Sequence, residues 1–308
     1  MKVLCLLGPT ASGKTSLAIQ VANASNVEII SVDSAMIYKG LDIGTGKPDK
    51  NILNKTPHRL VDILDPAESY SVGDFIKDVE SNIKEVHANG NIPLLVGGTM
   101  MYFNALYNGI GNMPVSDSKV REKLENKLKN SSLENLYFEL KKIDPIAAEK
   151  ININDPQRIL RALEVYYISG KPISSFNINN KSILKKYEVT NIVISPESRD
   201  KVHENIAVRF NEMLDMQFIN EVKRLHERQD LSLNNSSIRS VGYKQVWQYL
   251  ENEISFDDMK EQAVAATRQL AKRQFTWLRK LEKQVKFNWL NSYDSGILLK
   301  ALKLYNLV

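Results

Sequence analysis

The stretch GPTASGKTS, residues 8–16, decides how the chain folds, because it fits the phosphate-loop pattern G-x-x-x-x-G-K-[ST]. Gly8 and Gly13 allow a tight turn that points backbone N–H groups into one hollow, and Lys14 adds a mobile positive charge. The hydroxyl of Thr15 is a suitable ligand for Mg²⁺. We therefore predict that this loop holds phosphate groups through Gly8, Pro9, Thr10, Ala11, Ser12, Gly13, Lys14 and Thr15.

The segments on both sides of the loop support this prediction. The run KVLCLL before it is continuously apolar, as expected of a strand buried in a parallel sheet. A helix from about Thr15 to Ala24 follows, and its N-terminus points at the same anion. Strand, glycine-rich turn and helix in this order are the structural context that a phosphate loop requires.

Composition narrows the class of protein. The chain has 308 residues and a net charge of +5, and its only cysteine, Cys5, lies in the first predicted strand as a small core residue. It therefore forms no disulfide within the chain and no cysteine-based zinc site, which fits a reducing compartment. The first strand starts at about Val3, which leaves no room for a targeting peptide, and no apolar run is long enough to span a bilayer. We expect a cytoplasmic protein with no membrane partner.

The first hundred residues alternate between strands and helices, which is typical of a doubly wound α/β sheet. In such sheets ligands bind beyond the carboxyl ends of the strands. The phosphate loop, Asp33 and Thr99 all fall at such ends, so we expect them to converge on one site. The predicted elements after the first helix are a strand at 27–34, a short strand and turn at 58–66, a helix at 72–90, a strand at 92–99 and a helix from Met100.

The pattern then changes, and we predict an α/β protein in which a P-loop, doubly wound parallel-sheet core carries a helical insertion domain. The first part of the core covers residues 1–114, and the insertion covers residues 115–190, where Lys and Arg outnumber Asp and Glu. Residues 191–308 return to the core through a strand at 189–195 and are otherwise expected to be helical. In the last long helix, Arg268, Lys272, Arg279 and Lys283 share a basic face, and Val264, Ala271, Leu278 and Val285 form an apolar stripe.

The roles of Asp33 and Thr99 stay open at this point. An NTPase normally has an acid at the end of a second core strand, but here that strand ends in Gly97 and Gly98. Asp33 is a metal ligand, a base for an incoming nucleophile, or a structural cap of the turn after it. Thr99 is either a site residue or a helix cap, and His58 is interpreted as structural.

Several motifs together resemble one family, the tRNA dimethylallyltransferases, also called tRNA isopentenyltransferases. Its eukaryotic members carry a C-terminal zinc finger, which a chain with one cysteine does not form, so we expect a bacterial-type member. The motifs run in order through nearly the whole chain: GPTASGKT, VDSAMIYKGLDIGTGKP, PHRLVDILDP, YSVGDF, PLLVGGTMMYFNAL, NDPQRILRALEVY, RSVGYKQ and TRQLAKRQFTWLR.

The resemblance implies a reaction. The family transfers a dimethylallyl group from dimethylallyl diphosphate to N6 of the adenosine just 3′ of the anticodon of tRNA, and releases diphosphate. Lys14 and Mg²⁺ on Thr15 would meet the charge of the leaving diphosphate, Arg209 would lie near it, and Asp33 would take the proton from N6. Thr99 would contact the flipped nucleotide or the bridging oxygen of the donor. The expected partners are the anticodon stem-loop and the donor, and the family suggests a monomer.

The resemblance also implies tRNA contacts, some of them on the insertion. The basic face from Arg268 to Lys283 is a further candidate, either for RNA phosphates or for the donor diphosphate. Met36 and Met100 replace a glutamine and a glycine that many members have, which affects the details of base recognition. The implied contacts are Asp33, Ser34, Ala35, Met36, Thr99, Arg121, Gln157, Arg158, Ile159, Leu160, Arg161, Arg239, Ser240, Val241, Gly242, Tyr243 and Lys244.

Three other functions remain as alternatives. A P-loop small-molecule kinase predicts ATP turnover and has no use for the insertion. An adenylate isopentenyltransferase would act on a free nucleotide, which needs no extended basic surface. A non-enzymatic RNA-binding module would not need an intact phosphate loop.

Overall fold

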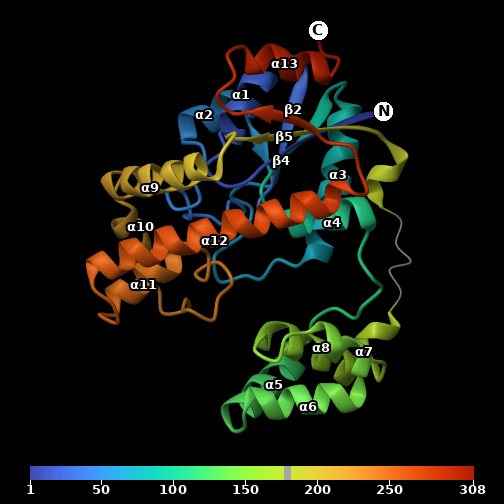
Figure 1. The fold of residues 1–308 in the computed structure, drawn as a ribbon, viewed down its shortest axis with the longest axis vertical. Coiled ribbons are helices and arrows are strands. Elements are labelled where there is room, and N and C mark those ends of the chain that lie inside the picture. Colours follow the sequence, from blue (N-terminus) through green and yellow to red (C-terminus); the bar gives the residue numbers. More distant parts are fainter. Residues whose placement is uncertain (177–181) are drawn as a thin grey trace. The chain divides into compact units, whose positions relative to one another are not determined.

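The computed structural model of the chain describes residues 1–176 and 182–308 (Figure 1). The chain divides into two compact units: unit 1 comprises Met1–Tyr107 and Ile183–Val308, and unit 2 comprises Asn108–Ser182. These bounds differ from the predicted insertion of 115–190. Residues 183–190 belong to unit 1 because strand β5 already pairs with β1 at Glu188, and residues 177–181 of the predicted insertion lie outside the described residues.

Unit 1 is built on a parallel six-stranded sheet with the strand order β3-β2-β4-β1-β5-β6. The doubly wound parallel sheet predicted from the sequence is confirmed, because every pairing is parallel and helices cover both faces. The prediction that the chain after residue 195 is otherwise helical is wrong at β6, an edge strand of four residues that is too short and too polar to show a strand pattern. The strands are β1 (Lys2–Leu7), β2 (Val27–Val32), β3 (His58–Arg59), β4 (Ile92–Gly97), β5 (Glu188–Ser195) and β6 (Asn288–Asn291).

The strand register brings three loops to one level. In the sheet β4 lies between β2 and β1, and Gly97 at the end of β4 is level with both Val32 and Leu7. The chain therefore leaves three neighbouring strands at the same height. The residues that follow are Asp33, Gly98 with Thr99, and the phosphate loop.

Alternating strand residues feed two hydrophobic clusters, one on each face of the sheet. Leu4, Leu6 and Ile29 pack with helices α1 (Lys14–Ala24) and α13 (Ile297–Leu304). Cys5 and Leu7 face the other side, where they pack with α3 (Val72–Ala88), α4 (Met100–Asn108) and the end of α12 (Phe256–Glu282). Cys5 is fully buried, as predicted, and burial raises the pKa of its thiol to about 12.

A third cluster joins the loop after β2 to the C-terminal helices. Ile37, Tyr38 and Leu41 pack with α10 (Phe218–His226), α11 (Tyr243–Leu250) and the first turns of α12. Helix α9 (Arg199–Asp215) contributes Phe210 to this cluster and packs along α12. The remaining short elements of unit 1 are α2 (Lys50–Lys55) and the 3₁₀ helix η2 (Ile183–Lys186).

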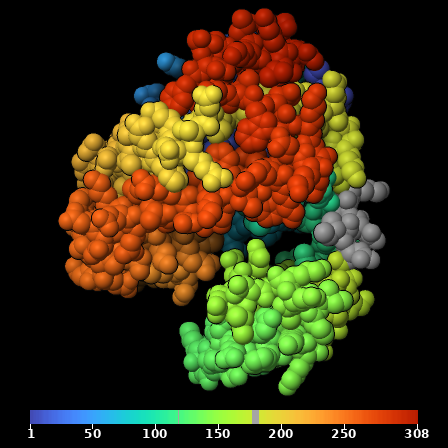
Figure 2. All heavy atoms as spheres, viewed as in Figure 1, coloured from blue at the N-terminus to red at the C-terminus, as the bar shows by residue number. Residues whose placement is uncertain are grey.

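The basic face predicted for the last long helix lies on α12, which crosses the face of unit 1 drawn in Figure 2. Arg268, Lys272 and Arg279 are exposed, and Lys283 follows the last helical residue. The predicted apolar stripe holds for Ala271 and Leu278, which are buried. It is wrong at Val285, because the helix ends at Glu282.

Unit 2 is helical and has its own core. It contains α5 (Ser118–Lys129), α6 (Leu133–Ile143), α7 (Pro145–Lys150), α8 (Pro156–Ser169) and the 3₁₀ helix η1 (Ile173–Ser175). Each of the four α-helices begins after an Asp or Ser whose side chain accepts a backbone N–H of the first turn. The buried residues of its core include Leu124, Leu136, Leu140, Ile159 and Leu163.

Two glycines give the phosphate loop its shape for different reasons. Gly13 has φ of +81°, in the left-handed region, and has open space around the position of a Cβ. Gly8 is fixed by proximity instead, since a Cβ there would lie 2.2 Å from the carbonyl oxygen of Ile194 in β5. The loop therefore turns directly against the end of β5.

This close approach predicts that Gly8→Ala destabilises the fold by at least about 3 kcal/mol, because the backbone of β1 or β5 must move. Gly40→Ala is the control: unlike Gly8, Gly40 has a positive φ, of +74°, but no atom lies within 4 Å of the added Cβ. It should lose only about 1–2 kcal/mol. Denaturant unfolding of both variants measures the difference, and equal losses would contradict the close contact.

Candidate active site

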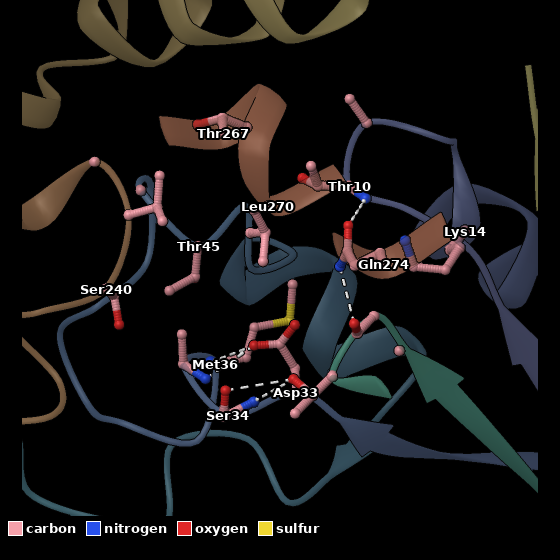
Figure 3. Close-up of a pocket in the computed structure, with 18 of the residues that line it drawn as sticks. Thr10, Lys14, Asp33, Ser34, Met36, Thr45, Ser240, Thr267, Leu270 and Gln274 are labelled. Carbon is pink, nitrogen blue, oxygen red and sulfur yellow. Dashed lines mark hydrogen bonds between the residues drawn. The ribbon is translucent and has the colours of Figure 1, made fainter. Parts of the chain in front are cut away.

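A cavity of about 450 Å³ in unit 1 opens at the carboxyl ends of β1, β2 and β4 (Figure 3). Figure 3 shows Asp33, Ser34 and Met36 grouped together, and Thr10, Lys14 and Gln274 grouped beside them. Loops after all three strands line the cavity, and so do residues of α9, α12 and the segment before α11. Its size is typical of a small-molecule site.

The phosphate loop forms one end of the cavity. The Lys14 ammonium donates to the carbonyl of Pro9 over 2.5 Å and lies 3.4 Å from the Ser12 hydroxyl. Helix α1 has Gly13 at its N-cap, and it has neither a side-chain cap nor an acidic residue in its first turn. Its free N–H groups and its dipole therefore favour an anion.

Arg209 adds a second cation from α9. Its guanidinium Nη2 donates to the carbonyl of Thr45 over 3.1 Å, and a Cβ on Gly46 would lie only 1.8 Å from that nitrogen. Burial lowers the pKa of Arg209, and Asp33 opposes this shift. The guanidinium still stays charged at neutral pH, because its ordinary pKa is above 12.

The Lys14 ammonium loses its proton more readily than the Arg209 guanidinium. Burial, and after it the charge of Arg209, lower the pKa of Lys14 to about 7, although the carboxylate of Asp33 opposes both. An anion bound between the two cations would reverse this shift by attracting the proton back. The loop is therefore matched to a ligand that carries more than one negative charge.

Asp33 supplies the carboxylate of the site. Its Oδ1 accepts the backbone N–H groups of Ala35 at 2.9 Å and Met36 at 3.2 Å, which fixes the turn after β2. Across residues 1–176 and 182–308, no hydrogen bond reaches its other oxygen, Oδ2. Asp33 is also the only Asp or Glu among the described residues that line the cavity. One oxygen thus holds the loop, and the other is available for a ligand.

Thr99 links the turn after β2 to the end of β4. Its Oγ1 accepts the backbone N–H of Ser34 over 3.1 Å and lies 3.3 Å from the Ser34 hydroxyl. Its carbonyl also accepts N–H groups of the first turn of α4. The site and structural interpretations of Thr99 are therefore compatible, because the residue lines the cavity while fixing the next loop.

Two buried charges hold the loop that carries Thr45. The Lys47 ammonium, only 2% exposed, pairs with Asp42 and Asp62 at 2.5 and 2.6 Å. On the other side, the carboxylate of Glu221 accepts the N–H of Ile43 at 2.8 Å and the hydroxyl of Tyr243 at 2.5 Å. Burial and the Glu221 charge raise the pKa of Tyr243 well above its ordinary value. These contacts fix the loop that Arg209 binds.

The structure brings most of the predicted site residues together. From the phosphate loop, Thr10, Ala11, Lys14 and Thr15 line the cavity, while Ser12 is buried behind it. Lys244, in contrast, is absent from the lining residues within the described part of the chain. The other predicted residues that line it are Asp33, Ser34, Ala35, Met36, Thr99, Arg209, Arg239, Ser240, Val241, Gly242 and Tyr243.

The predicted tRNA contacts of unit 2 lie on α5 and α8. Arg158 is exposed, while Arg121 and Arg161 pair with Glu164 at 4.0 and 2.8 Å. The Glu164 carboxylate is buried and also accepts the N–H of Asp117, so it ties the first residues of unit 2 to α8. Ile159 and Leu160 are buried in the core of this unit, so their side chains do not face solvent.

Sequence reasoning missed Gln274, whose side chain is buried between the phosphate loop and the end of β4. A signal was present, because Gln274 follows Ala271 by three residues and precedes Leu278 by four. It is therefore a polar residue on the buried stripe of α12. Buried polar side chains are normally hydrogen-bonded, which points to a specific partner. Arg273, Phe210 and Met213 also line the cavity without having been predicted.

No group of three or more His, Cys, Asp or Glu side chains in the described part of the chain could hold a metal ion. No helix in the same residues is long and apolar enough to cross a membrane.

The fold and the cavity define a P-loop enzyme of the α/β class, with an anion site and a single carboxylate at the ends of adjacent strands. The family model described as IPP transferase matches residues 36–281, and the model described as isopentenyl transferase matches residues 1–64. Because the first match covers well over half of the chain, the chain belongs to the IPP transferase family. This confirms the resemblance found in the sequence.

Solved structures agree with the family. The tRNA isopentenylpyrophosphate transferase of Bacillus halodurans is 32% identical, with a TM-score of 0.70 over 99% of this chain and 94% of that one. The tRNA delta(2)-isopentenylpyrophosphate transferase of Staphylococcus epidermidis is also 32% identical, with a TM-score of 0.68 over 99% of both chains. A eukaryotic dimethylallyltransferase acting on tRNA is 26% identical, with a TM-score of 0.80 over 99% of this chain and 78% of that one.

The lowered pKa of Lys14 predicts that binding of inorganic diphosphate at pH 8 takes up close to one more proton in the wild type than in Lys14→Met. The free ammonium is mostly deprotonated above pH 7 and regains its proton beside the anion. Below pH 6 the difference between the two proteins should vanish, because Lys14 is then already charged. Calorimetric titrations in buffers of different ionisation enthalpy measure the uptake, and equal uptake at pH 8 would contradict the prediction.

Proposed function

We propose that the protein transfers a dimethylallyl group from dimethylallyl diphosphate to N6 of the adenosine 3′-adjacent to the anticodon of tRNA. This proposal rests on one observation: two cationic side chains and one carboxylate lie close together in a single cavity. Lys14 and Arg209 suit a diphosphate, and Oδ2 of Asp33 suits a proton that leaves a nucleophile. Family membership supports the same reaction class.

In this reaction the bond between C1 and the bridging oxygen of the donor breaks, and a bond forms between N6 and C1. The electron pair leaves with the diphosphate, whose developing charge is met by Lys14, Arg209 and the N-terminus of α1. No phosphoryl group moves. The absence of an acidic residue at Gly97–Gly98 is therefore consistent with the chemistry, since no water has to be activated.

Asp33 has a defined task in this scheme. The adenine amine is a weak nucleophile because its lone pair is delocalised into the ring. A carboxylate that accepts a hydrogen bond from this amine orients it and takes the proton as the C–N bond forms. The hydrogen bonds between Thr99 and Ser34 fix the backbone next to Asp33.

The apolar lining suits the prenyl group. Met36, Phe210, Met213, Leu270 and Trp277 line the cavity. These side chains, apolar except for the indole N–H of Trp277, surround the alkyl carbon while it is transferred, and they exclude water that would otherwise compete with the amine.

The phosphate loop suits a magnesium ion that is bound together with the diphosphate. Mg²⁺ usually takes one or two protein ligands together with phosphate oxygens and waters, so a site without a carboxylate cluster is suitable. We assign the protein ligand to the hydroxyl of Thr15, which lines the cavity beside Lys14. When bound, the ion would neutralise charge on the leaving diphosphate.

The RNA would contact the exposed arginines and lysines of α12 and unit 2. Anticodon-loop bases are unstacked more easily than paired ones, and a target base must leave the stack to reach a buried donor. Arg239 and Ser240 line the cavity, so the segment before α11 would hold the extruded nucleotide. We also propose that the protein acts as a monomer, as the resemblance to the family implies.

The direct test combines purified protein, Mg²⁺, dimethylallyl diphosphate and an unmodified tRNA transcript that has adenosines following its anticodon. Mass spectrometry of the nuclease digest should find N6-dimethylallyl adenosine, and Lys14→Ala should abolish it. Prenylation of free AMP without prenylation of tRNA would contradict the acceptor, and consumption of ATP with a small acceptor would contradict the reaction.

Asp33→Asn should lower turnover by about 10²–10⁴-fold while tRNA affinity stays close to that of the wild type. The asparagine oxygen still accepts from Ala35 and Met36, so the turn is kept and only the base is lost. Single-turnover kinetics with saturating donor, together with a filter-binding titration, separate the two quantities. Turnover within a few-fold of the wild type would remove Asp33 from this role.

Two arginines of α8 should behave differently. Arg158 has 67% of its side chain exposed, and Arg158→Ala should weaken tRNA binding and reduce its salt dependence without changing stability. Arg161→Ala removes the closer of the two cationic partners of buried Glu164, so it should also lower the melting temperature. Binding titrations at several salt concentrations and thermal melts of both variants test this contrast, and identical behaviour would contradict it.

A further inference from the structure

Gln274 of α12 occupies the space between the phosphate loop and the end of β4, and it is only 6% exposed. Its Oε1 accepts the backbone N–H of Thr10 over 2.8 Å, and its Nε2 donates to the carbonyl of Gly98 over 2.8 Å (Figure 3). One partner can only donate and the other can only accept. The orientation of the amide is therefore fixed by its partners.

The fit around this amide is close. A Cβ on Gly98 would lie 2.6 Å from Nε2 of Gln274 and 3.4 Å from the carbonyl oxygen of Gly8. Residue 98 therefore needs to be glycine for the side chain of Gln274 to reach both loops. Buried amide groups that lose such partners are costly, so the two bonds hold this arrangement.

The two hydrogen-bond partners of Gln274 lie in different parts of the site, one on the side of the phosphate loop and one on the side of Asp33. Thr10 lies in the loop that holds Lys14, which we assign to the diphosphate. Gly98 precedes Thr99, whose Oγ1 accepts the N–H of Ser34 next to Asp33. A continuous path of hydrogen bonds and short chain segments thus runs from the phosphate loop through Gln274 to the loop of the base.

We propose that Gln274 is a positioning residue that sets the separation between the diphosphate site and Asp33. This inference rests on the proposed function. Transfer requires C1 of the donor and N6 of the acceptor to meet at about 3–3.5 Å with the diphosphate leaving opposite the amine, and small displacements are costly. Gln274 fixes this distance by holding the backbone of both loops, and it contributes no group to the reaction itself.

The variant Gln274→Glu tests the two bonds separately from the packing. Ionised, the introduced carboxyl has only acceptors, so it meets the Gly98 carbonyl without a donor. Protonated, it has one donor and one acceptor and can restore both bonds. We expect kcat at pH 8 to fall by about 10–10²-fold, with the KM for the donor changed less than about three-fold. Relative to the wild type at each pH, kcat should recover as the pH falls through the pKa of the introduced carboxyl.

Two further variants make the test specific. Gln274→Met fills the same space without hydrogen bonds, so its kcat should stay low relative to the wild type at every pH. Gln269→Glu introduces the same charge on the exposed side of the same helix, so its kcat should stay close to that of the wild type, and any effect of the charge on RNA binding should appear only in the KM for tRNA. Thermal melts confirm that each variant is folded before its kinetics are measured.

Three results would overturn the inference: a wild-type kcat in Gln274→Met, a loss confined to the KM for the donor, or a Gln274→Glu profile that follows Gln274→Met at every pH. Failure of the proposed function would look different. In that case the wild-type protein itself would form no prenylated tRNA in the same assay, before any variant is compared.

Discussion

The arrangement of the site depends on one constraint, the parallel pairing of β4 with both β2 and β1. Because Gly97 is level with Val32 and Leu7, the chain leaves three adjacent strands at one height. The phosphate loop, the Thr99 segment and the Asp33 turn therefore start side by side, with the Thr99 segment in the middle. Gln274 and the bond from Ser34 to Thr99 use this proximity, and neither could form if one strand were displaced in register.

The same geometry places two cationic side chains close together, which is unfavourable when no anion is bound. Lys14 and Arg209 lie close enough to lower the pKa of Lys14, and a single carboxylate on Asp33 opposes them. The protein holds these groups with neighbouring contacts: Thr45 binds Arg209, and the ion pairs of the buried Lys47 side chain and the hydrogen bonds of Glu221 hold the loop of Thr45. Functional sites commonly carry such unfavourable charge, because it is relieved by the ligand that they are built to bind.

The sequence predicted those parts of the fold and site that are encoded locally. The phosphate loop, its flanking strand and helix, Asp33 and Thr99 each follow from a short pattern and its place beside a predicted strand. The edge strand β6 was missed, because four residues with two asparagines carry no periodic signal and depend on pairing with β5. Gln274, Glu221 and Lys47 were missed for a related reason. Their roles come from partners distant in the chain, as the sequence separation of 264 between Gln274 and Thr10 illustrates.

The central claim is that the phosphate loop holds a leaving diphosphate and that the broken bond joins carbon to oxygen. Dimethylallyl diphosphate labelled with ¹⁸O at the bridging oxygen tests this claim most directly. After reaction with tRNA, mass spectrometry of the released diphosphate should find the label retained in it, because the bridging oxygen leaves with the phosphorus. A label found instead in dimethylallyl alcohol, with phosphoryl groups transferred elsewhere, would contradict the account.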